Sequence, residues 1–152
     1  MIRFATERTI HRSADEIWSF ATDITRHPEW MAVMDAVVVS GKPQEVGAVG
    51  RETVRMGPRR FVAEFVVSES TPGRTIAWPV GGRTPIAGEA RLDLEAMGPD
   101  STRVRWSGGF TLTGLWRIIE PLMADEIRSG EAAELVWLKT TLEARAAAPT
   151  VA

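Results

Sequence analysis

The sequence of residues 115–145 is LWRIIEPLMADEIRSGEAAELVWLKTTLEAR, and this stretch decides the fold. Its apolar residues recur every three or four positions, which predicts one long amphipathic helix. The apolar stripe comprises Leu115, Ile118, Ile119, Leu122, Met123 and Ile127, and it resumes at Leu135, Leu138 and Leu142. The rest of the chain is patterned mostly as β-strands, so the stripe must bury itself against a sheet. Pro121 marks either the first turn of the helix or a kink.

Small residues interrupt the stripe in mid-helix, at Ser129, Gly130, Ala132 and Ala133. A glycine inside a helix lowers helix stability by about 1 kcal/mol relative to alanine, so the presence of Gly130 needs an explanation. One interpretation is a kink or a close contact between the helix and the sheet. The other is that the small side chains leave room for a ligand.

Seven segments before this helix are predicted as strands from their alternation or their β-rich composition. They are residues 2–10, 33–40, 47–56, 60–68, 74–80, 86–96 and 102–112. Short turns such as Gly57-Pro58 and Pro72-Gly73 join them, which favours an antiparallel meander. The pair Gly108-Gly109 lies inside the last strand and predicts a bulge or a bend there.

Two short helices are expected between the first and second strands. Ser13 is a suitable N-cap, and Glu16 completes a capping box, so a helix should begin here and end near Thr25. Residues 27–31 predict a second short helix or turn, with Pro28 near its start. The result is an α+β fold in which a curved antiparallel sheet of about seven strands wraps around a long C-terminal helix. Such packing leaves a gap that suits a small molecule.

Length and composition favour a single globular domain. The chain has 152 residues, of which 44% are hydrophobic and 25% charged, and we expect the domain to cover residues 1–145 with a frayed tail at 146–152. The net charge of −2 gives no reason to expect a nucleic-acid partner. A basic group, Arg51, Arg55, Arg59 and Arg60, could contact phosphates, but we interpret it as a solvated strand and turn.

Several kinds of site lack the residues they need. The chain has no cysteine and two isolated histidines, which argues against disulfides, thiolate nucleophiles and metal centres. It has no glycine-rich phosphate loop, so no cofactor is expected. The first residues show no signal-peptide pattern and no apolar run reaches membrane-spanning length, so we expect a cytoplasmic protein without integral membrane contact, as a monomer or homodimer. Arginine outnumbers lysine, which is typical of GC-rich bacterial genomes.

Four stretches carry a resemblance to a known family. Residues 10–18, IHRSADEIW, are similar to an opening motif I-x-A-P-x-E-x-V-W, with Arg12-Ser13 in place of the usual Ala-Pro. Residues 23–30, DITRHPEW, are similar to D-x-x-x-x-P-x-W, and residues 70–78, STPGRTIAW, to P-x-R-x-x-x-W. Residues 134–143, ELVWLKTTLE, are similar to L-x-x-L-K-x-x-L-E. Together they resemble the START-like superfamily, also called SRPBCC, which includes the polyketide cyclase/dehydrase and lipid-transport families.

The resemblance spans nearly the whole chain and implies the helix-grip fold. Members of this superfamily include aromatase/cyclases, lipid carriers, hormone receptors, co-chaperone domains and ring-hydroxylase subunits. The matching motifs seat helices on the sheet and do not select among these functions. Function must therefore be argued from the residues that face the expected pocket.

The inward faces of the strands and the mid-helix gap supply the predicted ligand-binding residues, which are mostly apolar and aromatic. They are Phe61, Phe65, Ile76, Trp78, Ile86, Ala90, Leu92, Val104, Trp106, Phe110, Ile119, Met123, Ile127 and Gly130. We therefore expect the protein to bind a small hydrophobic molecule, namely a lipid, a polyketide or an aromatic metabolite.

Three residues are candidates for catalysis if the protein is instead a polyketide cyclase, aromatase or dehydratase. Glu52 shares a strand face with Val54 and Met56 and so should point inward, where burial would raise its pKa. It could equally pair with Arg8, which shares a strand face with Ile10. His27 is the third candidate. The absence of tyrosine, a common proton donor, favours binding over catalysis. An interaction module is a third function that nothing in the sequence requires.

Overall fold

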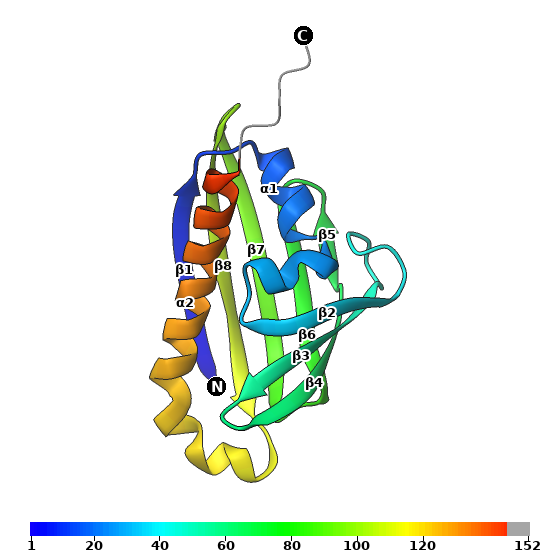
Figure 1. Ribbon diagram of the computed structural model, residues 1–152, viewed down its shortest axis with the longest axis vertical. Coiled ribbons are helices and arrows are strands. Elements are labelled where there is room, and N and C mark those ends of the chain that lie inside the picture. The colour runs from blue at the N-terminus through cyan, green and yellow to red at the C-terminus, as the bar shows by residue number, and fades with distance from the viewer. Residues whose placement is uncertain (146–152) are drawn as a thin grey trace.

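The computed structural model describes residues 1–145, which form a curved sheet with a long helix and three shorter helices (Figure 1). The strands are β1 (Ile2–Ile10), β2 (Val33–Ser40), β3 (Val49–Met56), β4 (Arg59–Val66), β5 (Glu69–Thr71), β6 (Thr75–Arg83), β7 (Ile86–Gly98) and β8 (Ser101–Leu112). The helices are α1 (Ala14–Ala21), the 3-10 helices η1 (Ile24–Glu29) and η2 (Gly114–Ile119), and α2 (Glu120–Ala144). The predicted tail at 146–152 lies outside the described residues.

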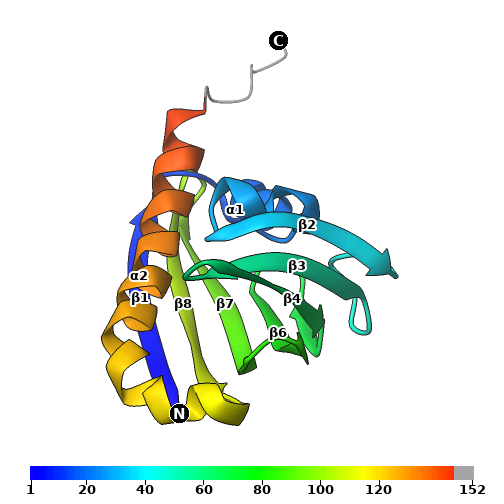
Figure 2. The same cartoon turned by 60° about the horizontal axis from the view of Figure 1, so that its bottom comes forward.

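The strands form one antiparallel sheet in the order β1-β8-β7-β6-β4-β3-β2, with the short strand β5 paired to β6. Figure 2 shows the curvature of the sheet, with α2 along one side and β2 along the other. This is the predicted helix-grip fold. The pairing of β1 with β8, the first and last strands, places the amino-terminal strand next to α2.

The start of α1 follows the predicted capping box. The Ser13 side chain accepts a hydrogen bond of 3.2 Å from the backbone N–H of Glu16. The helix ends at Ala21 rather than near Thr25, because Asp23 caps the next helix by accepting a hydrogen bond of 3.1 Å from the N–H of Thr25. The first predicted short helix is therefore α1. The second is η1, which begins three residues earlier than predicted and holds Pro28 near its end rather than near its start.

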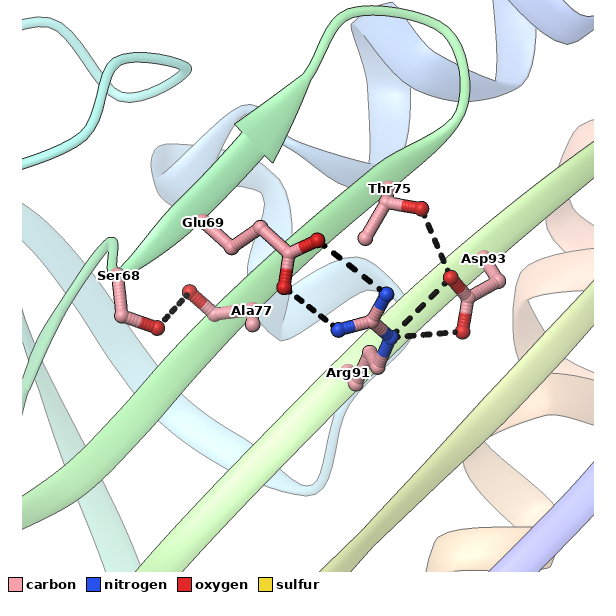
Figure 3. A network of polar contacts seen from close by, with 6 residues as sticks. All are labelled: Ser68, Glu69, Thr75, Ala77, Arg91 and Asp93. Carbon is pink, nitrogen blue, oxygen red and sulfur yellow. Dashed lines mark hydrogen bonds and ion pairs between the residues drawn. The ribbon is translucent and has the colours of Figure 1, made fainter.

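The sequence did not predict β5, a strand of three residues. Side chains hold it in place: Arg91 on β7 donates to Glu69 on β5 at 2.7 Å and to Asp93 at 3.1 Å (Figure 3). Thr75 on β6 donates to the same Asp93 at 2.8 Å, which completes the network. The hydrogen bonds from Arg91 to Glu69 and then to Asp93 raise the pKa of its guanidinium. These contacts tie the β5–β6 hairpin to β7.

The glycine pair in β8 does not form a bulge. Strand pairing runs through Gly108 and Gly109 on both sides without a shift in register. A side chain at Gly108 would overlap the carbonyl oxygen of Glu89 on β7 and the ring of Phe4 on β1. Glycine is needed here because the neighbouring strands approach closely, not because the strand is interrupted.

The C-terminal helical segment has two parts. Residues 114–119 form the 3-10 helix η2, and Pro121 lies in the first turn of α2, so the proline marks the start of the α-helix. In the second half of α2 the predicted stripe is correct, because Leu135, Leu138 and Leu142 are completely buried. The prediction is wrong for Leu115, Ile118 and Leu122, which are exposed to solvent. A 3-10 helix has three residues per turn, so the stripe does not keep one direction across the junction.

No helix within residues 1–145 is long and apolar enough to cross a membrane.

Candidate functional site

A cavity of about 650 Å³ lies on the concave side of the sheet, enclosed by η1, η2, α2 and strands β2–β4 and β6–β8. This volume is typical of sites for small molecules. Its lining includes the buried residues His27, Trp78, Trp106 and Glu134, which mark the inner end. The lining also includes exposed residues of the β3–β4 turn and of α2, which mark the open end: Arg55, Gly57, Pro58 and Glu126.

Nine of the fourteen predicted ligand-binding residues line this cavity. They are Phe65, Trp78, Ile86, Ala90, Trp106, Phe110, Met123, Ile127 and Gly130. Three others, Ile76, Leu92 and Val104, are completely buried in the core cluster that contains Ile17 and Leu138. Alternation identifies the inward face of a strand correctly, but helices cover part of that face and leave no cavity there.

The other two predicted residues lie near η2. Phe61 on β4 meets the ring of Trp116 edge-on, with ring centroids 5.8 Å apart. Ile119 is half-buried at the end of η2. Trp116, rather than either of them, lines the cavity at this point.

Gly130 faces the cavity without a close neighbour. A Cβ atom added at this position would meet no atom within 4 Å outside the local backbone. A close contact between helix and sheet therefore does not explain the glycine. The absence of a side chain leaves cavity space beside α2.

His27 is the first buried polar residue of the site. It belongs to η1, is 1% exposed, and its Nδ1 lies 2.5 Å from Oε1 of Glu52 on β3. Its Nε2 lies 3.2 Å from the carbonyl oxygen of Ala21, which only accepts hydrogen bonds, so Nε2 carries a proton. Nδ1 is then the ring nitrogen that faces the carboxyl of Glu52. Both side chains line the cavity.

Glu52 points inward as predicted, but the alternative of a pair with Arg8 is wrong. Arg8 is exposed and donates to the carbonyl of Glu7 at 2.9 Å. The two residues are far apart in the sheet, because β1 begins the strand order and β3 lies near its other end. Nothing in the local pattern indicated the true partner, which comes from a 3-10 helix.

Aromatic rings surround His27. Its ring centroid lies 5.9 Å from Trp30, 5.9 Å from Phe65 and 5.7 Å from Trp78. Trp106 joins this aromatic cluster through Trp30 at 5.5 Å and Trp78 at 6.1 Å. The ring of His27 is therefore packed among aromatic rings.

Two further carboxyl groups, neither of them predicted from the sequence, reach the cavity from α2. Trp106 donates a hydrogen bond of 2.9 Å from its indole Nε1 to Oε2 of Glu131. The backbone N–H of Ala32 donates one of 2.8 Å to Oε1 of Glu134. A signal was available: Ile127, Glu131, Glu134 and Leu138 follow helical spacing, so the two glutamates occupy the gap in the apolar stripe.

Burial controls the ionisation of this pair. It raises the pKa of Glu131 to about 7, against a partial opposing effect from the Trp106 hydrogen bond. It raises the pKa of Glu134 well above its ordinary value, and the charge of Glu131 raises it further. The charge of Glu52 acts in the same direction on both. The pair therefore holds a proton near neutral pH and can donate or accept one.

Within the described residues, no group of three or more histidines, aspartates and glutamates is placed to hold a metal ion.

Comparison with known proteins agrees with the architecture. A family model described as polyketide cyclase/dehydrase and lipid transport matches residues 1–143. The chain belongs to this family. No curated protein matches the chain.

Solved structures share the fold of this polyketide cyclase/dehydrase and lipid-transport family member at low sequence identity. The ZhuI aromatase/cyclase from Streptomyces sp. R1128 is 13% identical with a TM-score of 0.78, and the match covers 97% of each chain. The protein TTHA0849 from Thermus thermophilus is 16% identical with a TM-score of 0.74, covering 95% of this chain and 99% of that one. A START superfamily protein from Mycobacterium smegmatis is 15% identical with a TM-score of 0.65, covering 88% and 98%. These likenesses establish the fold alone.

Proposed function

We propose that this family member binds a small, largely apolar molecule in the cavity, with one polar group of the ligand directed at Glu131 and Glu134. The observation that carries the proposal is the composition of the wall. Apolar and aromatic side chains from six strands and α2 enclose most of the space, and buried polar groups are few. Apolar contact supplies affinity in such a site, and the few polar groups set orientation.

The ligand's polar group is expected to be one that exchanges hydrogen bonds with a carboxyl pair, such as a hydroxyl or a carbonyl. Glu131 and Glu134 together hold a proton to donate and oxygen atoms to accept with. The histidine–glutamate pair lies in the same cavity and offers a second point of contact.

Native mass spectrometry of the gently purified protein tests this proposal. An added mass that disappears on denaturation is the expected result, and its value assigns the ligand to the lipid, polyketide or aromatic class. Where the bare mass is found, titration with N-phenylnaphthylamine, a neutral fluorescent probe of apolar cavities, gives the second test. No retained mass and no fluorescence increase would contradict the proposal.

A second candidate function is enzymatic, and the Glu131–Glu134 pair favours it. General acid–base catalysis is most efficient when the pKa of the group lies near the working pH, and that of Glu131 is about 7. In dehydration of a β-hydroxy carbonyl compound, the ionised carboxyl would take the proton from the carbon next to the carbonyl. The protonated carboxyl would give its proton to the departing hydroxyl, so that water leaves and a carbon–carbon double bond forms.

Two isosteric variants separate the two functions. Under the enzymatic proposal, Glu131→Gln and Glu134→Gln each abolish turnover of a β-hydroxy carbonyl substrate while probe binding persists. Turnover that survives both substitutions would contradict a catalytic role for the pair and leave binding as the function.

A further inference from the structure

An apolar patch projects from the outer face of η2 and the start of α2. Leu115 is 84% exposed, Ile118 is 77% exposed and Leu122 is 84% exposed. All three lie within eight residues of one another, and none of them is buried against the sheet. We refer to Leu115, Ile118 and Leu122 as the η2 patch. The segment that carries it lies at the end of the molecule opposite α1 (Figure 1).

The η2 patch borders the open end of the cavity. Trp116 and Met123, from the same segment, line the cavity. Trp116 also meets Phe61 of β4, which brings η2 against the β3–β4 hairpin. The turn of that hairpin, Gly57-Pro58, lines the cavity as well. The patch and the hairpin therefore belong to one rim.

Positive charge gathers on the same rim. Arg55, Arg59 and Arg60 of the hairpin and Arg117 of η2 are exposed, and none forms an ion pair within residues 1–145. By contrast, Arg51 farther along β3 is paired with Glu64 at 2.8 Å.

Nearby acidic groups do not cancel this charge. Glu120 is bound by the amino-terminal ammonium of Met1 at 3.0 Å, and Asp125 by Arg128 at 3.2 Å. Glu126 is exposed at the open end of the cavity and offsets one of the four arginine charges. The rim therefore keeps an excess of positive charge although the chain carries a net charge of −2.

We propose that this rim docks on an anionic lipid bilayer, with the η2 patch inserted among the acyl chains and the four arginines against the phosphates. A surface that combines long aliphatic side chains with neighbouring arginines has the composition of an interfacial membrane anchor. Side chains that project by more than three-quarters of their surface fit a fluid hydrocarbon layer, which needs no matching groove. The basic group of the hairpin thus has phosphates as its partner.

Docking in this way would turn the open end of the cavity toward the bilayer. An apolar ligand could then move between membrane and cavity without crossing water. This route rests on the proposed ligand-binding function, whereas docking itself does not.

Co-sedimentation with vesicles tests the docking. One set contains equal parts of phosphatidylcholine and phosphatidylglycerol, and the other contains phosphatidylcholine alone. The wild-type protein is expected to sediment with the anionic vesicles, to bind the neutral ones more weakly, and to be released by salt. Wild-type protein that stays in the supernatant with both sets, or binds both equally, overturns the proposal.

Two variants assign the binding to the rim. The triple variant Leu115→Ser, Ile118→Ser, Leu122→Ser should bind anionic vesicles about tenfold more weakly or worse. The variant Arg59→Gln, Arg60→Gln, Arg117→Gln should lose up to about a hundredfold. A matched control, Val46→Ser with Met97→Ser, removes exposed apolar side chains elsewhere and should bind as the wild type does. Triple-serine protein that binds undiminished overturns the proposal.

The oligomeric state and the retained ligand are measured on the same protein samples. If light scattering shows a wild-type dimer that the triple-serine variant breaks, a second copy covers the patch and the proposal is overturned. If native mass spectrometry finds retained ligand in protein that ignores vesicles, docking fails while the proposed function stands. If the protein binds vesicles but takes up no ligand or probe, the docking stands while the proposed ligand-binding function fails.

Discussion

Nδ1 of His27 lies 2.5 Å from Oε1 of Glu52, which joins the 3-10 helix η1 to strand β3 inside the cavity. Removal of the carboxyl would leave a buried ring nitrogen without its partner. We expect Glu52→Ala to lower the free energy of unfolding by about 2 kcal/mol, measured by urea denaturation. Glu64→Ala on β4 is the control, because its partner Arg51 is well exposed and the change should cost less than about 1 kcal/mol. Equal losses for the two variants would contradict a structural role for the buried pair.

The carboxyl pair on α2 makes stability depend on pH. The pKa of Glu131 is raised from 4.5 to about 7 in the folded protein, so the folded state holds a proton that the unfolded state has released. Its contribution is complete below the unfolded pKa and is lost as pH rises to the folded value. We expect unfolding free energy to fall by up to about 3 kcal/mol between about pH 5 and about pH 8.

Glu131→Gln removes this titrating group while keeping its shape. Its unfolding free energy, from denaturant curves at each pH, should vary less than that of the wild type and exceed it on the alkaline side. Parallel curves for the two proteins would show that Glu131 is not the source of the dependence.

The hydrogen bond from Trp106 to Glu131 should be visible in the titration of that carboxyl. This bond lowers the pKa of Glu131, so Trp106→Phe, which keeps an aromatic ring and removes the donor, should raise it further. The shift can be followed by carbon NMR of labelled glutamate side chains. In Trp78→Phe, which alters a neighbouring indole without a bond to Glu131, the midpoint should stay in place. An unchanged titration midpoint in Trp106→Phe would show that this hydrogen bond does not affect the pKa of Glu131.

Gly130→Leu should affect binding and stability in opposite directions. The side chain would enter the cavity without meeting protein atoms at its Cβ, so affinity for N-phenylnaphthylamine should fall about tenfold or more through lost space. Helix propensity should at the same time add about 1 kcal/mol to the unfolding free energy.

Ser129→Leu provides the comparison for this change. The neighbouring position is exposed and does not line the cavity, so probe affinity should be unaltered. Undiminished affinity in Gly130→Leu would mean that the ligand does not reach the middle of α2.

Local patterns in the sequence predicted most of the fold. Alternation placed the strands, and Ser13 with Glu16 placed the first helix, because both signals depend on neighbouring residues alone. The short strand β5 was not predicted because three residues are too few to show a pattern, and its contact with Arg91 joins residues far apart in the chain. The change of helix type before Pro121 escaped because apolar spacing does not distinguish a 3-10 turn from an α-helical one.

The sequence predicted which face of each strand points inward, but not which inward residues line the cavity and which lie in the core. Ile76 and Phe65 both point inward, yet only Phe65 lines the cavity, since what covers a strand depends on tertiary packing. Glu131 and Glu134 escaped because acidic residues on a helix usually face solvent. Their position between Ile127 and Leu138, at helical spacing, indicates instead that they face the cavity.

The aromatic cluster around His27 gives the protein an optical reporter of its own. Trp30, Trp78 and Trp106 lie within about 6 Å of one another in consecutive pairs, and the chain contains no tyrosine. Near-ultraviolet absorption, circular dichroism and emission are therefore dominated by the six tryptophans, and the three rings of the cluster are close enough to couple their electronic transitions. Two of the three rings also line the cavity, and one of them donates to Glu131. Ligand binding and the protonation of Glu131 can therefore be followed as changes in the tryptophan spectra of the unlabelled protein.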